Sequence, residues 1–314
     1  MSPVHGSGDA IAVLAGSAHP ALAEQIARAL GAPLGKSRSE HFPDGEMHVA
    51  VEPQSVDGRD VFVVQPTSAP VSEHLLELLM LADACRRAGA ASVSAVVPYF
   101  GYARQDRRKR PGEPIGVHVV AQLFATARLE RIVSVDLHSD VTEAVLDVPM
   151  ENTTAVPLLA QAIAERAARA GREAVIVAPD LGAVKLAREY ARALSLPVAV
   201  VHKIRTSGTD VSIERVAGDV RGRRAIIIDD MISTGGTIVS AARAVQQHGS
   251  EGELVVAATH AVLVPGALER LRAGGVRDLI VTDTIAPSTV DSSTMIVPVA
   301  QLLADAVRRV ARVR

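Results

Sequence analysis

The segment RAIIIDDMISTGGTIVSAARAVQQ, which spans Arg224–Gln247, decides the fold. It begins with the apolar run Ala225–Ile228, continues with two adjacent acids, Asp229 and Asp230, and passes through a Gly- and Thr-rich loop into a helical pattern. Continuous apolar runs of this length are typical of strands buried on both faces of a parallel sheet. The segment therefore predicts a strand, a loop and a helix, with the acids at the carboxyl edge of the sheet, where open α/β sheets bind ligands.

The loop from Thr234 to Thr237 predicts a phosphate-binding site. The first N–H groups of a helix and the positive end of its dipole attract phosphate, and glycine lets the backbone approach the anion closely. The acids Asp229 and Asp230 can accept hydrogen bonds from two adjacent ribose hydroxyls or bind a metal ion. The alternative is a tight turn in which the acids only cap the helix, but two adjacent acids at the end of a buried strand are otherwise costly.

Outward from this segment, short β-branched runs alternate with amphipathic helical patterns. The strand candidates are Ile11–Leu14, Val61–Val64, Val93–Val97, Ile132–Val135, Ala174–Val177, Val198–Val201, Ala225–Ile228, Leu254–Thr259 and Leu279–Thr282. The helical patterns include Ala21–Leu30, which follows Pro20 and stops at Gly31, and Val156–Ala170. This alternation predicts an α/β fold with two doubly wound parallel-sheet domains.

The most plausible junction between the domains is Val148–Thr154, so that residues 1–150 form an N-terminal domain and residues 151–314 a C-terminal one. The last helical pattern, Val299–Arg314, carries an apolar face and must dock, with the first domain as a candidate partner.

Composition narrows the class of protein. The chain has 314 residues, of which 48% are apolar, enough for two domains with real cores. A net charge of −2, with both signs spread along the chain, argues against a nucleic-acid partner. The single cysteine, Cys85, excludes internal disulfides, suits a reducing compartment and is expected in a helix core. No secretory signal is visible, and Leu254–Leu268 is too short and polar to span a bilayer, so no membrane association and a cytoplasmic location are expected.

The segment PYFGYARQDRRKRPGEPI, Pro98–Ile115, carries the second strong signal. It contains five cations within the seven residues Arg104–Arg110, beside Tyr99, Phe100 and Tyr102. Such a charge density suits a strongly anionic partner such as a triphosphate. A solvated basic loop is the ordinary alternative for a charge run, and the adjacent aromatic residues weaken it.

With these two segments, the chain closely resembles the ribose-phosphate pyrophosphokinases, in which Pro-Tyr-x-Gly-Tyr-Ala-Arg-Gln-Asp is diagnostic, over nearly its whole length. In the first half, Phe42–Glu46 resembles the family's Phe-x-Asp-Gly-Glu loop, which reads the adenine of ATP from a neighbouring subunit. Asp136–His138 resembles the segment whose histidine helps to position the magnesium ion of the bound ATP. The ATP-binding residues implied by the resemblance are Phe42, Asp44, Glu46, Arg104, Gln105 and His138.

In the second half, Asp180–Ala183 resembles the diphosphate loop and Asp229–Thr237 the ribose 5-phosphate loop. Lys203 and Arg205 resemble the basic pair that opens a flexible catalytic loop, and the polar stretch Thr206–Ser212 that follows is expected to be neither strand nor helix. The implied ribose 5-phosphate residues are Asp229, Asp230, Ser233, Thr234, Gly235, Gly236 and Thr237, and the diphosphate loop comprises Asp180, Leu181, Gly182 and Ala183. The implied catalytic residues are Lys203, Arg205 and His138, and the implied ligands of Mg²⁺ are His138 and Asp180.

The resemblance implies an enzyme of nucleotide biosynthesis, a magnesium-dependent transferase that moves the β,γ-diphosphate of ATP onto the C1 hydroxyl of ribose 5-phosphate and releases AMP. A homo-oligomer with active sites shared between subunits is expected. Two alternatives remain: a phosphoribosyltransferase, which would share the Asp229–Thr237 loop but does not need the ATP segments, and a catalytically silent regulatory homologue, which would lose the cations.

Two departures from the family pattern stand out. Ser233 occupies a position where most members carry an acid in the ribose 5-phosphate loop. After His138, Val141–Leu146 replaces the common Gln-Ile-Gln-Gly-Phe-Phe, so control by ADP and phosphate is not expected. We interpret Ser233 as a variation that preserves activity, because a serine can also accept a hydrogen bond.

Overall fold

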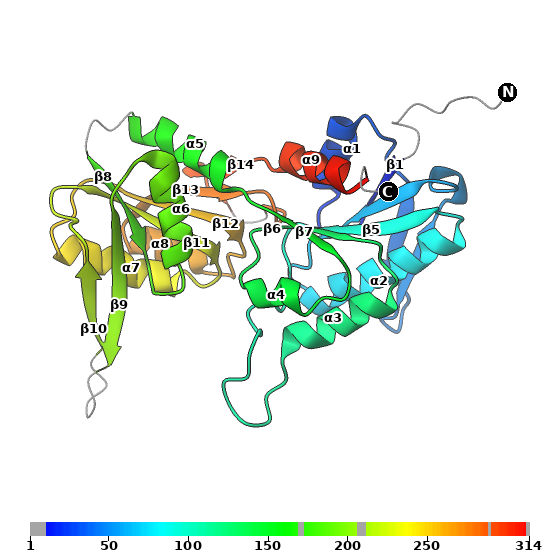
Figure 1. Ribbon diagram of the computed structural model, residues 1–314, viewed down its shortest axis with the longest axis horizontal. Helices are drawn as coiled ribbons and strands as arrows, with labels where there is room; N and C mark the ends of the chain where they lie inside the picture. Colours follow the sequence, from blue (N-terminus) through cyan, green and yellow to red (C-terminus); the bar gives the residue numbers. More distant parts are fainter. Residues whose placement is uncertain (1–10, 169–172, 206–211, 288–289, 312–314) are drawn as a thin grey trace. The chain divides into compact units, whose positions relative to one another are not determined.

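The computed structural model describes residues 11–168, 173–205, 212–287 and 290–311 (Figure 1). The chain divides into two compact units. Unit 1 consists of Met1–Thr154, Thr284–Ala286 and Pro298–Arg314, and unit 2 of Ala155–Asp283 and Pro287–Val297. The chain therefore returns to unit 1 for its last helix.

Unit 1 is built on a five-stranded parallel sheet whose strand order, β1-β4-β5-β6-β7, follows the chain. These strands are β1 (Ile11–Ala15), β4 (Asp60–Val64), β5 (Ser92–Val97), β6 (Ile132–Val135) and β7 (Met150–Thr153). Between β1 and β4 the chain forms a separate antiparallel hairpin, β2 (Ser37–His41) and β3 (Met47–Val51), followed by the short helix η1 (Pro53–Ser55). The hairpin was not predicted, because its first strand, SRSEH, has no apolar alternation.

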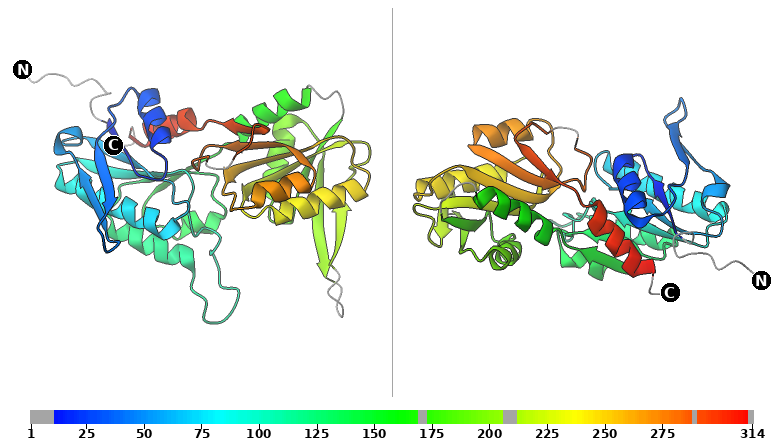
Figure 2. Two further views of the ribbon diagram at one scale, coloured as in Figure 1. Left: turned by 180° about the vertical axis from the view of Figure 1, so that it is seen from behind. Right: turned by 90° about the horizontal axis from the view of Figure 1, so that it is seen from above.

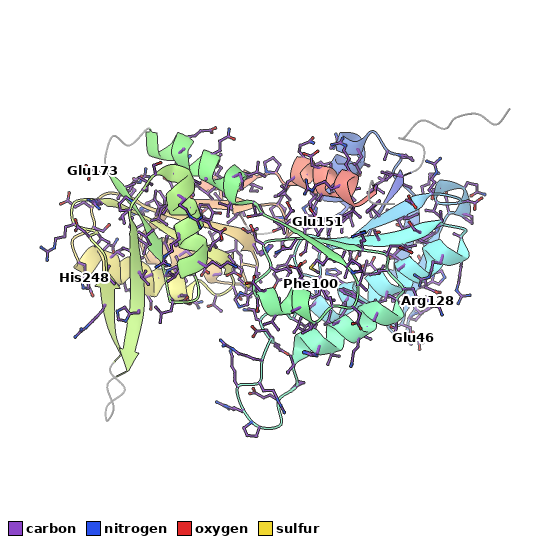
Figure 3. All side chains as sticks on the ribbon, viewed as in Figure 1. Glu46, Phe100, Arg128, Glu151, Glu173 and His248 are labelled. Carbon is purple, nitrogen blue, oxygen red and sulfur yellow. The ribbon has the colours of Figure 1, made fainter. Side chains whose placement is uncertain are left out.

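Helices cover both faces of this sheet (Figure 2). On one face, α2 (Val71–Arg87) and α3 (Gly116–Thr126) bury their apolar side chains against β1, β4 and β5. Cys85 is fully buried in this core, as predicted. On the other face lie α1 (Pro20–Leu30) and, beside it, α9 (Ala300–Ala311), where Arg308 donates to the carbonyl of Ala29. Arg309 Nε also donates to Glu151 Oε1 of β7, 2.9 Å away; Glu151 is labelled in Figure 3.

Unit 2 contains a seven-stranded sheet in the order β10-β9-β8-β11-β12-β13-β14, parallel except for β10. Its strands are β8 (Ala174–Ala178), β9 (Val198–Arg205), β10 (Ser212–Ala217), β11 (Arg224–Ile232), β12 (Leu254–Ala261), β13 (Val276–Thr282) and β14 (Thr294–Val297). Helices α5 (Val156–Ala168) and α6 (Val184–Leu194) contact one another and the sheet, and α7 (Gly236–Gln247) and α8 (Ala267–Ala273) form a second such pair. The strand order reverses between β8 and β11, which creates the switch point where open α/β sheets bind ligands.

A buried ion cluster holds the amino-terminal ends of the unit 2 strands together. Asp278 of β13 accepts hydrogen bonds from Arg166 of α5, Nε at 3.1 Å, and from Arg224 of β11, Nη2 at 2.9 Å. Arg224 Nε also donates to the carbonyl of Glu253. Asp278 and Arg224 are almost completely buried, so each charge depends on the other for compensation.

The predicted α/β fold with parallel sheets is confirmed, and each of the nine predicted strands is present. The expectation that Asp229 and Asp230 follow the strand was wrong, because β11 continues to Ile232 and pairs with β12 on the way, Asp229 opposite Ala258. Ser212 was wrongly assigned to an irregular stretch, because it pairs with Arg205 in the β9–β10 ladder. The remainder of that stretch, residues 206–211, lies outside the described residues, as do residues 169–170 at the end of the helix predicted for Val156–Ala170. No helix in the described ranges is long and apolar enough to cross a membrane.

Candidate functional site

The switch point of unit 2 brings together two of the predicted ligand loops. β8 and β11 are neighbouring parallel strands, so the loops that follow them, which begin at Pro179 and Ser233, leave the same edge of the sheet. Asp180 in the first loop is close enough to Asp229 to act on its ionisation. The diphosphate and ribose 5-phosphate residues predicted from the sequence therefore share one edge of one sheet.

The two acids of β11 form a close, half-buried pair. Asp229 Oδ1 accepts a hydrogen bond from the backbone N–H of Asp230 at 3.0 Å. Burial, reinforced by the negative charges of Asp230 and Asp180, raises the pKa of Asp229 to about 8. Without a bound partner, these influences favour the protonated form of Asp229. A hydroxyl donor or a cation at this edge would stabilise the ionised form.

The loop after β11 accepts hydrogen bonds from the segment that leads into α8 and from α8 itself. The carbonyl oxygen of Ser233 accepts from the N–H of Val264 at 3.2 Å, and that of Thr234 accepts from Arg270 Nη1 at 2.6 Å. Gly235 caps α7 with a φ of +75°, and a side chain there would press against Leu271, whose Cδ2 lies 3.1 Å from the Cβ position. The carbonyls of the loop are thus engaged on the α8 side, while the first N–H groups of α7 have no partner within their own helix.

The side chain of Asp180 fixes the backbone of the diphosphate loop. Asp180 Oδ1 accepts from the N–H groups of Gly182 at 2.9 Å and Ala183 at 3.2 Å, just before α6 begins. Asp180 itself is exposed, and Leu181 is 71% exposed, so neither is part of the core. Both of these hydrogen bonds use Oδ1, so they do not involve the second carboxylate oxygen.

The predicted catalytic cations of unit 2 lie near the end of a strand. Lys203 and Arg205 belong to β9, where their backbones pair with Glu214 and Ser212 of β10. The prediction of a strand ending at Val201 was therefore too short by four residues. The loop expected to carry the closing motion, residues 206–211, lies outside the described residues.

In unit 1, the loop Phe42–Glu46 closes the β2–β3 hairpin. The N–H of Phe42 donates to the carbonyl of Glu46 at 2.8 Å, and Asp44 Oδ1 accepts from the N–H of Glu46 at 3.1 Å. Gly45 has a φ of +93°, which the tight turn requires. Phe42 is half exposed, with its ring 5.3 Å from that of His48.

The other predicted ATP residues of unit 1 lie on connections that follow β5 and β6. The carbonyl oxygen of Gln105 accepts from the N–H of Val117 at 3.3 Å, and its side chain lies against Gly116, where a Cβ would come within 2.4 Å of Oε1. Arg104 is exposed beside it. His138 is exposed in a turn directly after β6, which Asn152 supports by accepting from the N–H of Leu137 at 3.3 Å.

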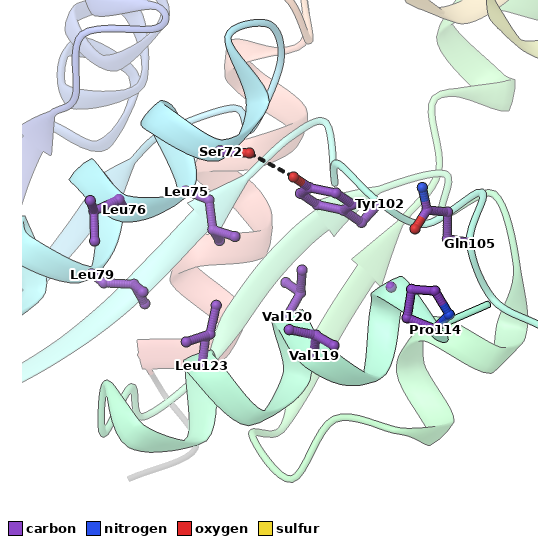
Figure 4. A pocket seen from close by; sticks show the side chains of 11 residues that line it. Ser72, Leu75, Leu76, Leu79, Tyr102, Gln105, Pro114, Val119, Val120 and Leu123 are labelled. Carbon is purple, nitrogen blue, oxygen red and sulfur yellow. Dashed lines mark hydrogen bonds between the residues drawn. The ribbon is translucent and has the colours of Figure 1, made fainter. Parts of the chain in front are cut away.

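An apolar groove of about 380 Å³ runs between α2 and α3 and ends beside Gln105 (Figure 4). At that end, the hydroxyl groups of Tyr102 and Ser72 are hydrogen-bonded at 2.7 Å. The leucines and valines that line the groove include three exposed ones, Leu76, Val119 and Leu123.

Sequence reasoning missed two polar residues that support these loops. Arg270 holds the ribose 5-phosphate loop from α8, 36 residues further along the chain. Glu77 is almost completely buried on α2 and contacts the β2–β3 hairpin through Ser39. Neither has a local sequence signal, because each acts on a segment distant in sequence.

No group of three or more His, Cys, Asp or Glu side chains able to hold a metal ion occurs among the described residues. Mg²⁺ is usually held by only one or two carboxylates together with substrate phosphates, so the exposed carboxylate of Asp180 is chemically suitable.

The switch-point acids and the Thr-Gly-Gly-Thr loop of unit 2 define a phosphoribosyltransferase-type α/β domain. The sequence model described as the phosphoribosyl transferase domain matches residues 149–277. A second model, the N-terminal domain of ribose phosphate pyrophosphokinase, matches residues 11–127. The chain belongs to the ribose-phosphate pyrophosphokinase family.

Individual relatives agree over most of the chain. A ribose-phosphate pyrophosphokinase of Fusobacterium nucleatum is 42% identical over 276 residues, which are 88% of this chain and 86% of that protein. Ribose-phosphate pyrophosphokinase 1, chloroplastic, of Arabidopsis thaliana is 40% identical over 310 residues, 98% of this chain and 76% of that protein. The crystal structure of phosphoribosylpyrophosphate synthetase from Mycobacterium smegmatis is similar with a TM-score of 0.89 and 38% identity, covering 97% of this chain and 99% of that one.

Proposed function

We propose that this protein transfers the β,γ-diphosphoryl group of ATP to the C1 hydroxyl of ribose 5-phosphate, giving 5-phosphoribosyl 1-diphosphate and AMP. The observation that carries this function is the presence, in one chain, of both family domains. A phosphoribosyltransferase would need only the second domain. The N-terminal match over residues 11–127 therefore favours the pyrophosphokinase.

Unit 2 would bind ribose 5-phosphate. The backbone of Thr234–Thr237 at the start of α7 would hold the 5-phosphate, because helix N-termini attract anions. Asp229 and Asp230 would accept hydrogen bonds from the ribose hydroxyls. The raised pKa of Asp229 supports this role, because burial and the neighbouring acids disfavour its charge, which hydroxyl donors would stabilise.

Unit 1 would bind ATP, through Arg104, Gln105 and the Phe42–Glu46 loop. When bound, Mg²⁺ would neutralise phosphate charge, with Asp180 and His138 as protein groups that can hold it. The exposure of both side chains is compatible with ligation of a hydrated ion.

Catalysis would consist of positioning and neutralisation of charge. The C1 oxygen of ribose 5-phosphate attacks the β-phosphorus in line, the bond from that phosphorus to the α,β-bridging oxygen breaks, and AMP leaves. The C1 hydroxyl loses its proton in the process. Lys203, Arg205 and Arg104 would stabilise the diphosphoryl group during transfer, and no covalent phosphoenzyme is needed.

A homo-oligomer with shared active sites is part of the proposal. Leu76, Val119 and Leu123 expose apolar surface along the α2–α3 groove, and contiguous apolar patches on soluble proteins often mark interfaces. Sharing can be tested with Asp44→Ala and Arg104→Ala variants, each expected to be nearly inactive. Mixing them under conditions of demonstrated subunit exchange should restore part of the activity, and an absence of recovery would argue against sharing.

The decisive experiment is to supply ATP, Mg²⁺ and ribose 5-phosphate and to measure AMP. Formation of AMP that depends on ribose 5-phosphate supports the pyrophosphokinase. Release of pyrophosphate from 5-phosphoribosyl 1-diphosphate with a nucleobase, without AMP formation from ATP, would indicate a phosphoribosyltransferase instead. Binding of both substrates without turnover would indicate a silent homologue.

A further inference from the structure

Glu77 is a buried carboxylate to which the mechanism assigns no role. It lies in the middle of α2 with 1% of its surface exposed. Its Oε1 accepts from the N–H of Ser17 at 2.9 Å and from Ser39 Oγ at 2.6 Å. Its Oε2 accepts from Ser17 Oγ at 2.5 Å and from Gln65 Nε2 at 2.6 Å. All four of these donors are neutral, and together they compensate the removal of the carboxylate from water.

The four donors belong to three separate segments of unit 1. Ser17 lies in the turn between β1 and α1, Ser39 in β2, and Gln65 directly after β4. Gln65 Oε1 also accepts from the N–H of Ala18 at 3.1 Å, so it fixes the same turn a second time. Glu77 therefore joins the hairpin to the carboxyl edge of the five-stranded sheet.

The hairpin is not paired to that sheet, so side-chain contacts hold it: Val49 and Val51 of β3 pack against the core of unit 1, and β2 makes polar contacts. Alternate side chains of β2 contact other parts of unit 1: Ser37 Oγ donates to the carbonyl of Ala15 at 2.9 Å, Ser39 contacts Glu77, and His41 Nε2 lies 3.1 Å from Glu73 Oε1. The spacing of two along the strand matches the spacing of four between Glu73 and Glu77 along the helix. Ser39 is the central contact of this row.

The position of the Phe42–Glu46 loop follows from that of the strand. The loop begins one residue after His41 and is closed on itself by the bond between Phe42 N–H and Glu46 carbonyl. Such a turn moves as one body with the strands that carry it. A shift of β2 on α2 therefore moves the loop as a whole.

From this geometry we infer that Glu77 is a positioning residue for ATP: through Ser39 it fixes the hairpin that presents the Phe42–Glu46 loop to the nucleotide. The inference rests on the proposed function, because it takes the adenine role of that loop as given. It predicts that loss of the contact weakens ATP binding and leaves ribose 5-phosphate binding unchanged.

Ser39→Ala is the cleanest test, since it removes the hairpin contact and leaves the three other bonds of Glu77. The KM for ATP should rise about five- to tenfold, because one hydrogen bond to the carboxylate is lost, while the KM for ribose 5-phosphate stays within about twofold. Ser39→Thr keeps the hydroxyl on an exposed strand and should restore the wild-type KM. Arg38→Gln, at an exposed position of the same strand, is the matched control and should change neither KM.

Glu77→Gln should have a larger effect than Ser39→Ala. One oxygen of Glu77 faces the N–H of Ser17 and the other faces Gln65 Nε2, so either orientation of a glutamine amide sets a donor against a donor. A rise of tenfold or more in the KM for ATP is expected. If Glu77→Gln does not fold, Ser39→Ala alone decides the question.

Amide hydrogen exchange provides a readout that needs no activity. In Ser39→Ala, the amides of β2 and β3 should exchange faster, while those of β4 and β5 keep their protection. Unchanged exchange in the hairpin, or an unchanged KM for ATP in folded Ser39→Ala, would overturn the inference. A Phe42→Ala variant tests the adenine role of the loop independently of Glu77. If Phe42→Ala also leaves the KM for ATP unchanged, the adenine role of the loop is wrong. If Phe42→Ala raises this KM and Ser39→Ala does not, the adenine role stands and Glu77 does not position the loop.

Discussion

In unit 2 the candidate ligand loops leave neighbouring strands of one sheet, whereas in unit 1 the Phe42–Glu46 loop lies on a hairpin outside the five-stranded sheet. The difference follows from strand order. The order of the unit 2 sheet reverses between β8 and β11 and opens a crevice there, but the order of the unit 1 sheet follows the chain without reversal. Unit 1 must therefore present its loop on an added element, held by side-chain contacts such as that between Ser39 and Glu77.

The contrast predicts different consequences of substitution in the two units. In unit 2 the loop after β11 is fixed through its own backbone carbonyls: that of Ser233 accepts from the N–H of Val264, and that of Thr234 accepts from the side chain of Arg270. An added hairpin can shift without unfolding the domain. Substitutions in the frame of unit 2 should reduce stability or turnover, and substitutions around the hairpin should mainly reduce nucleotide affinity.

The largest effect is expected from Asp278→Ala, which removes the centre of the buried ion cluster in unit 2. Arg224 would be left buried without its carboxylate, so the free energy of unfolding should fall by about 3–5 kcal/mol in denaturant titrations. Asp83→Ala, which breaks exposed pairs with Arg86 and Arg87 on α2, is the control and should hardly change the free energy of unfolding. Equal losses for the two variants would contradict the view of unit 2 as a rigid frame.

Lys203→Ala comes next and concerns the rate. If this cation acts only in the transition state, its loss should reduce kcat by about two to three decades, or roughly 3–4 kcal/mol, and hardly change the KM for ribose 5-phosphate. Steady-state kinetics with varied ribose 5-phosphate would measure both. A near-normal kcat would remove Lys203 from the mechanism.

The candidate site of unit 2 was largely predictable because its signals are local. Asp229 to Thr237 form one continuous segment, and a buried apolar run followed directly by paired acids and glycines is characteristic of phosphate-binding loops. The extension of β11 through the acids was not predictable, since pairing with β12 overrides the low strand propensity of Asp. The hairpin of unit 1 was missed for the opposite reason: β2 is polar, and one of the residues that it contacts is the buried Glu77, which in sequence looks like an ordinary exposed helix acid.

A smaller effect, seen only in the pH dependence of stability, is expected from Asp229→Asn. An unfolded aspartate ionises near pH 4, but the pKa of folded Asp229 is raised to about 8, so between these values the folded state binds more protons and stability falls as pH rises. Asparagine cannot ionise and removes this penalty. In the absence of substrates and Mg²⁺, the melting temperature should therefore rise by a few degrees at pH 8 and hardly at all near pH 4. A rise in melting temperature of the same size at both pH values would show that ionisation of Asp229 does not destabilise the folded protein.

Ser233→Ala should have the smallest effect and tests whether the departure from the family pattern matters. The carbonyl of Ser233 is already engaged by the N–H of Val264, so the backbone of the loop should keep its position without the hydroxyl. Only a neutral hydrogen bond to the substrate is then lost, and ribose 5-phosphate binding should weaken by about 1 kcal/mol in titration calorimetry. Asp230→Ala should weaken it far more, because it removes a charge-assisted contact. If Ser233→Ala proved as damaging as Asp230→Ala, the serine would have a catalytic role of its own. The hydrogen bonds of the loop backbone would then not explain how unit 2 functions with a serine where most family members carry an acid.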